Sequence, residues 1–235
     1  MIALERSPTG LARTAFEALE EFANPKAAHR RRKADRSVAL SKGRKALVRL
    51  KSSPHDQKVR APHLAAAIAA IETLEAAVLS LDAITHRLTD AQELLDAADA
   101  PMTDDMAGET DEESGTRALL AERYDELRED ITRIASTAYA GRTNLLDGLG
   151  GQLEVPLDGT GRAKAIIPGV NASVSSADSP DGIDLPPPEM AFATAQEREV
   201  IARALSAAIQ QTSAFAARFE VDAALMAARV QPPKR

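Results

Sequence analysis

The chain has 235 residues and no cysteine, which excludes disulfide bonds and thiolate metal sites. Aromatic residues make up only 3% of the chain and hydrophobic residues 44%, a balance that favours slim, closely packed helices over a bulky globular core. We therefore expect a mainly α-helical chain. The lack of cysteine fits an extracellular location as well as a cytosolic one, so composition leaves the compartment open.

The formal net charge of −6 conceals an uneven distribution. Residues 26–60 contain 13 Lys and Arg against Asp35 and Asp56, a charge of +11, so the rest of the chain carries −17. We interpret residues 1–60 as a basic N-terminal arm, partly helical or disordered. Its densest part is the run of Arg30, Arg31, Arg32 and Lys33. Such a run predicts contact with a polyanion, with an acidic partner or with the chain's own acidic body.

A long helix is predicted from about Pro62 to Ala98, because proline suits the first turn and apolar residues follow at near-heptad spacing. These are Leu64, Ile68, Ile71, Leu74, Val78, Leu81, Leu88 and Leu95. At about 1.5 Å per residue, such a helix would be about 54 Å long, the length of a rod. We find no run of about 18 apolar residues, so no membrane span is expected. The N-terminus also lacks the pattern of a signal peptide.

A second helix is predicted from about Thr116 to Tyr139, after an acidic, exposed loop at 99–115. Its apolar residues recur at alternating steps of four and three: Leu120, Tyr124, Leu127, Ile131, Ile134 and Ala138. A narrow stripe of this kind packs against other long helices. Gly141 lies just past the stripe, where a helix often needs a glycine cap.

Beyond Gly148 the pattern changes to period two at 152–157, and turn residues lead to a second short strand at 163–167. The expected fold is thus an elongated antiparallel bundle of long helices with one β-hairpin. We expect four parts along the chain: the arm at 1–60, two long helices at 61–148, the hairpin and a Pro- and Ser-rich linker at 149–188, and a returning helix at 189–230.

Two short motifs follow each other at the end of the second helix. They are Ile131-Thr132-Arg133-Ile134-Ala135 and Asn144-Leu145-Leu146-Asp147-Gly148. Together they resemble bacterial flagellin, whose pattern here is Ile-x-Arg-Ile-Ala, then Phe-Asn-Gly, then Leu-Leu-x-Gly. Tyr139-Ala140-Gly141 stands near the Phe-Asn-Gly, about one position out of register. The resemblance covers about residues 62–230, and the terminal polymerisation segments of that family are altered or missing.

The resemblance implies a shaft of two N-terminal helices, a β-hairpin and a C-terminal helix. It also implies a structural role: a subunit or accessory of the extracellular flagellar filament, exported through the flagellar apparatus and packed against other flagellin subunits. The residues expected to carry this packing are Leu120, Tyr124, Leu127, Ile131, Ile134, Leu145, Leu146 and Gly148.

Two other hypotheses stay open. The altered ends favour a cytoplasmic, flagellin-like module that binds flagellar assembly or export proteins and regulates them. A nucleic-acid-binding protein led by the basic arm is the weakest hypothesis, because no aromatic residues for base stacking are interleaved with the basic ones.

No catalytic pattern is found in the sequence. The four histidines, His29, His55, His63 and His86, show no metal-ligand spacing. The acidic loop does not match a calcium-binding loop, and the glycines at 148–161 lack the Lys and Ser or Thr of a phosphate-binding loop. We therefore expect no enzyme activity, no cofactor, no bound metal and no small-molecule substrate.

Overall fold

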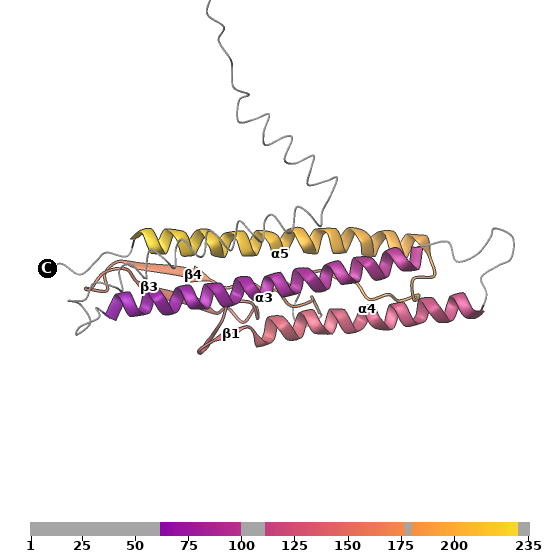
Figure 1. The fold of residues 1–235 in the computed structure, drawn as a ribbon, viewed down its shortest axis with the longest axis horizontal. Helices are drawn as coiled ribbons and strands as arrows, with labels where there is room; N and C mark the ends of the chain where they lie inside the picture. The colour runs from indigo at the N-terminus through magenta and orange to yellow at the C-terminus, as the bar shows by residue number, and fades with distance from the viewer. Residues whose placement is uncertain (1–61, 100–110, 177–179, 230–235) are drawn as a thin grey trace, which may run out of the picture.

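The structure is a computed structural model that describes residues 62–99, 111–176 and 180–229. Within these ranges it contains three helices and four short strands: α3 (Pro62–Asp99), α4 (Asp111–Thr137), β1 (Tyr139–Ala140), β2 (Thr143–Asn144), β3 (Gln152–Pro156), β4 (Lys164–Pro168) and α5 (Ala195–Arg229) (Figure 1). The prediction of a mainly helical chain is confirmed. The basic arm, including Arg30, Arg31, Arg32 and Lys33, lies outside the described residues.

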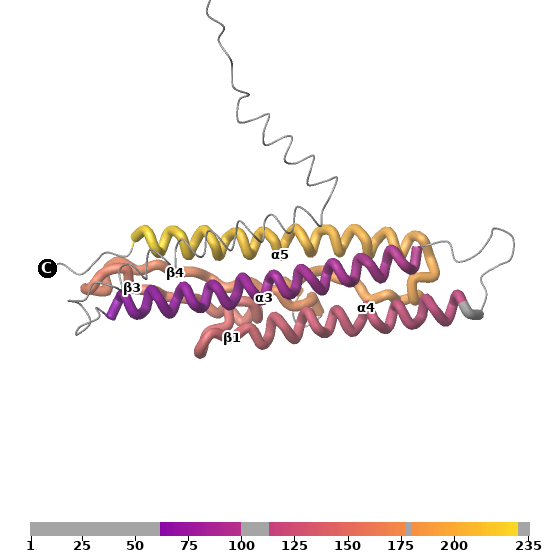
Figure 2. Tube along the Cα trace, viewed as in Figure 1, coloured from indigo at the N-terminus to yellow at the C-terminus, as the bar shows by residue number. Residues whose placement is uncertain are grey.

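Helix α3 lies between the other two helices and contacts both of them (Figure 1). The colours of Figure 2 show that α4 and α5 run in the direction opposite to α3. Two pairs of adjacent residues on α3, Ala70 with Ile71 and Ala77 with Val78, are buried together. Such pairs widen the apolar stripe of a helix, so α3 can pack against two neighbours at once.

A buried side-chain hydrogen bond crosses the apolar contact between α3 and α5. The hydroxyls of Thr85 and Thr212 lie 3.2 Å apart, and both residues are buried. Each hydroxyl is also close to a carbonyl of its own helix: Leu81 O at 2.8 Å from Thr85, and Ala208 O at 3.0 Å from Thr212. Because a buried polar contact in an apolar seam favours one register, this pair helps to align α5 with α3.

By length and composition alone, α3 is apolar enough to cross a membrane, since an 18-residue window of it has a mean hydropathy of 1.8. In the structure 44% of that window is buried inside the protein. The core helix of a helical domain shows the same properties. The absence of a membrane span therefore stays a prediction.

Two small antiparallel sheets are present in the described part of the chain, where one hairpin was predicted. The pairing of β3 with β4, with Leu153 opposite Ile167, agrees with the period-two pattern. The additional pairing of β1 with β2 surrounds a tight turn. Gly141 lies in this turn with a φ of 64°, which glycine adopts without strain. The prediction of Gly141 as a helix cap is thus wrong, since α4 already ends at Thr137.

The start of each later helix also differs from the prediction. Helix α4 begins at Asp111, before the predicted Thr116, and includes Gly115. One exposed glycine costs a helix only about 1 kcal/mol, which is too little to end it. Helix α5 begins at Ala195 instead of residue 189, and a non-helical turn precedes it. The hydroxyl of Thr194 accepts a hydrogen bond from the Glu197 N–H at 3.2 Å and so caps α5.

The segment between β4 and α5 has little regular structure, yet it packs against α4. Its buried apolar residues are Ala172, Val174, Ile183, Leu185 and Phe192. Arg128 Nε on α4 donates to the Leu185 carbonyl at 3.0 Å. The Val174 N–H donates to the hydroxyl of Thr132, also on α4, at 3.2 Å. The predicted linker is thus part of the core in the described residues.

Candidate functional site: the α4 seam and the turn that follows it

The predicted apolar stripe of α4 is buried at its centre. At each end of the helix, the buried position is one residue after the predicted one. The predicted residues that are fully buried are Tyr124, Leu127 and Ile131. Leu120 and Ile134 are half-buried and pack at the edge, while Ala121 and Ala135 take the buried places. A straight helix drifts about 20° per heptad from an exact seven-residue repeat, which moves the ends of the buried line. We call Ala121, Tyr124, Leu127, Ile131 and Ala135 the α4 seam.

Tyr124 joins the α4 seam to the turn before α5. Its ring meets the buried ring of Phe192 edge to face, with the ring centres 5.6 Å apart and the planes at 82°. Its hydroxyl donates to the Pro186 carbonyl at 3.4 Å, a long hydrogen bond. Burial raises the pKa of Tyr124, because the phenolate would lose its water.

This raised pKa predicts an alkaline loss of stability. Above pH 10, the ordinary pKa of tyrosine, the unfolded chain ionises Tyr124 while the folded protein keeps it neutral. Its contribution to the free energy of unfolding is thus complete below pH 10 and falls above it, by about 1.4 kcal/mol per pH unit. Tyr124→Phe should remove this part of the decline, measured as the difference in Tm between pH 8 and pH 11.

Tyr139→Phe is the matched control, because Tyr139 is the chain's other tyrosine and is 57% exposed. This variant should decline with pH as the unchanged protein does. Equal declines in all three proteins would show that Tyr124 does not carry the effect.

Asn144 lies in the turn after α4, and its side chain caps the C-terminal end of that helix. Its side-chain amide donates to the carbonyls of Ala135 at 2.8 Å and Ser136 at 3.1 Å. Its side-chain oxygen accepts from the Leu146 N–H at 2.8 Å. Carbonyls at the end of a helix otherwise lack partners, so this buried asparagine satisfies two of them. Asn144 was not among the predicted packing residues, although the motif Asn144–Gly148 contains it.

The predicted turn residues form hydrogen bonds with the segment that follows β4. Leu145 and Leu146 are buried, and their carbonyls accept from the N–H groups of Val170 at 2.7 Å and Ala172 at 2.9 Å. Gly148 has a φ of 71°, and an added Cβ there would lie 2.6 Å from Asn171 Cγ. Both its backbone conformation and the space around it therefore require glycine.

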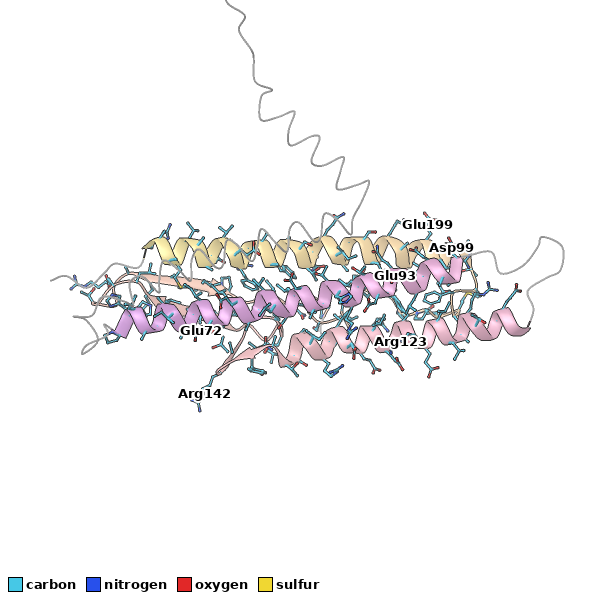
Figure 3. All side chains as sticks on the ribbon, viewed as in Figure 1. Glu72, Glu93, Asp99, Arg123, Arg142 and Glu199 are labelled. Carbon is cyan, nitrogen blue, oxygen red and sulfur yellow. The ribbon has the colours of Figure 1, made fainter. Side chains whose placement is uncertain are left out.

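At the other end of α4, Arg198 connects three parts of the molecule. Its Nε lies 2.8 Å from Asp99 Oδ1 at the end of α3, and its Nη1 donates to the Phe192 carbonyl at 2.7 Å. The guanidinium side chain is 17% exposed. Figure 3 shows Asp99 and Glu199 at this same end of the helices. The contact fixes the start of α5 against the end of α3.

An open groove of about 470 Å³ lies beside this turn and is lined by Pro186, Pro187, Met190, Val200 and neighbouring residues. Among the described residues, no group of three or more His, Asp or Glu is placed to hold a metal ion. The contacts of the α4 seam and the turn after it are apolar packing, which excludes water, together with the hydrogen bonds of Asn144.

No protein-family model matches this chain, and no curated protein matches it. The resemblance to flagellin therefore rests on the motifs of the second helix and on the order of the elements.

Proposed function

We propose that this chain is a structural protein of the flagellin type, a subunit or accessory of the bacterial flagellar filament. In this proposal the three long helices act as one elongated antiparallel bundle. The observation that supports it best is the order of elements: two long helices, the Asn144–Gly148 turn, a hairpin and a returning helix. This is the order that the flagellin resemblance implies.

The helices have the length and regularity that a filament subunit needs. Helix α3 has 38 residues, which at about 1.5 Å each gives about 57 Å. Helices kink mainly at proline, and the only proline in the three helices is Pro62 at the first position of α3. Stiff, straight helices of this length expose long sides on which neighbouring subunits can pack.

The charges of the three helices favour one of these sides for contacts between subunits. Helix α3 has seven acidic residues and one basic residue, a formal charge of −6, and α4 has eight and four, a charge of −4. Helix α5 has four of each and is neutral. Two copies of this protein therefore repel each other least where their α5 helices meet. We infer that contacts with other flagellin-like subunits use the α5 side.

The test is the location of the protein in a flagellated cell. Antibodies against the chain are applied to sheared filaments and to washed cell bodies, and we expect the signal in the filaments. As a control, the Ile131→Asp variant should be absent from filaments because its seam cannot form, whereas Leu119→Asp, changed at an exposed position of the same helix, should be present.

Signal confined to the cytosol would overturn the filament role. It would favour the alternative, in which the same fold binds flagellar assembly or export proteins inside the cell.

A further inference from the structure

Helix α3 carries a second line of residues, mostly alanine with one leucine and one glutamate, that no described element covers. It consists of Ala65, Ala69, Glu72, Ala76, Leu79 and Ala83, at repeating steps of four and three residues. All are exposed except the half-buried Ala76, and Leu79 is 66% exposed. We call this line the outer stripe. Because its spacing matches a helix–helix seam, it is suited to one more amphipathic segment.

Negative charge surrounds the outer stripe. From Pro62 to His86, α3 has three acidic residues and no Lys or Arg. Of these, Glu75 and Asp82 lie one helical turn before and after Leu79, and Glu72 lies within the stripe. Within the described residues, Glu72 and Glu75 form no ion pair. Figure 3 shows Glu72 on α3. The complementary segment should thus be apolar and basic.

The chain itself contains such a segment directly before α3. Residues 37–51 include Leu47, Val48 and Leu50, interleaved with Lys45, Arg49 and Lys51. They lie within the part of the arm that carries +11. The apolar residues match the outer stripe, and the basic residues match the carboxylates beside it.

The connection is long enough for the segment to reach the stripe. Ten residues, 52–61, separate residue 51 from Pro62, and extended they span at most about 33–36 Å. Leu79 lies about 26 Å along the helix from Pro62 at about 1.5 Å per residue. A short tether also gives the segment an effective concentration of about a millimolar, which favours it over the same segment of another copy.

We propose that residues 37–51 bind the outer stripe of α3 in the same chain. Leu47, Val48 and Leu50 cover Leu79 and the alanines, and the basic residues lie beside Glu72 and Glu75. The basic arm is then an internal partner of the helical body. This proposal does not depend on the flagellar role.

The test uses the full-length protein and the rate at which trypsin cleaves after Lys45, Arg49 and Lys51, followed by mass spectrometry. We expect protection at about 50 mM salt that is lost at about 500 mM, because screening weakens the ionic contacts. Leu79→Gln, and separately the double change Glu72→Gln with Glu75→Gln, should each speed cleavage about tenfold, the factor expected for losing one good contact.

The matched controls are Leu119→Gln, at an apolar residue of α4 that is 68% exposed, and Glu199→Gln on α5. Both should leave cleavage unchanged, and circular dichroism should show that every variant remains helical. Rapid cleavage of the unchanged protein at low salt would overturn the proposal, as would equal cleavage of Leu79→Gln and Leu119→Gln. Protection that rises with protein concentration, or that requires added double-stranded DNA, would also overturn it and assign the segment to another partner.

Discussion

The Ile131→Asp variant is expected to lose about 4 kcal/mol or more of its unfolding free energy. Ile131 is fully buried at the centre of the α4 seam, where it packs with apolar residues. A carboxylate there loses its water among apolar neighbours, which is among the most costly changes in a protein core. Since whole domains are stable by only about 5–15 kcal/mol, this loss is a large part of the total. The variant should therefore unfold at a much lower urea concentration than the unchanged protein, as measured by far-UV circular dichroism.

Leu119→Asp makes the same chemical change on the same helix, at a side chain that is 68% exposed. It should alter the unfolding free energy by no more than about 0.5 kcal/mol, as surface changes usually do. If the two variants unfolded at the same urea concentration, the seam on α4 would not exist as described.

Phe192→Ala is the second variant with a large expected effect, a loss of about 3–5 kcal/mol. The ring is fully buried against Tyr124, and its removal leaves a cavity between the turn and α4. Met190→Ala is the control, because Met190 lies in the same turn and is 59% exposed. Thermal and urea unfolding of both variants measure the difference, and similar losses would mean that the ring does not anchor the turn.

A second variant at this position, Phe192→Gly, separates packing from backbone strain. Phe192 has a φ of 63°, and its neighbour Ala191 has a φ of 50°, in the region that costs a non-glycine residue about 1–2 kcal/mol. Phe192→Gly loses the ring but also relieves this strain, which offsets the usual cost of glycine. It should therefore be no less stable than Phe192→Ala. A clearly lower stability would show that the backbone is not strained there.

The long helices were predictable from the sequence because their stripes repeat over many turns. Leu74, Leu81 and Leu88, each seven residues after the last, mark α3 regardless of what surrounds it. The hairpin of β3 and β4 was predictable for a similar reason, since Val155 and Ile167 alternate with exposed residues. Periodicity reveals a buried face when one face is buried throughout an element.

The turn contacts were not predictable in the same way. Asn144 bonds to carbonyls eight and nine residues earlier, and Asn171 pairs with Asp147, so neither side chain belongs to a local apolar repeat that could report it. The segment before α5 looked exposed because Ser and Pro dominate it, yet isolated apolar residues such as Ile183 anchor it. One available signal was missed: Thr194 followed three residues later by Glu197 is the pattern of a helix start.

The hydrogen bond between Thr85 and Thr212 joins residues 127 positions apart. During synthesis the ribosome therefore releases α3 long before its partner α5 exists, and the nascent chain cannot close the contact between these two helices until α5 has emerged. Contacts between residues so far apart in the sequence form later than local ones, because the long intervening loop must close first. The pair of α3 and α4, which are neighbours in the sequence and in space, is therefore the part of the helical structure that can assemble first.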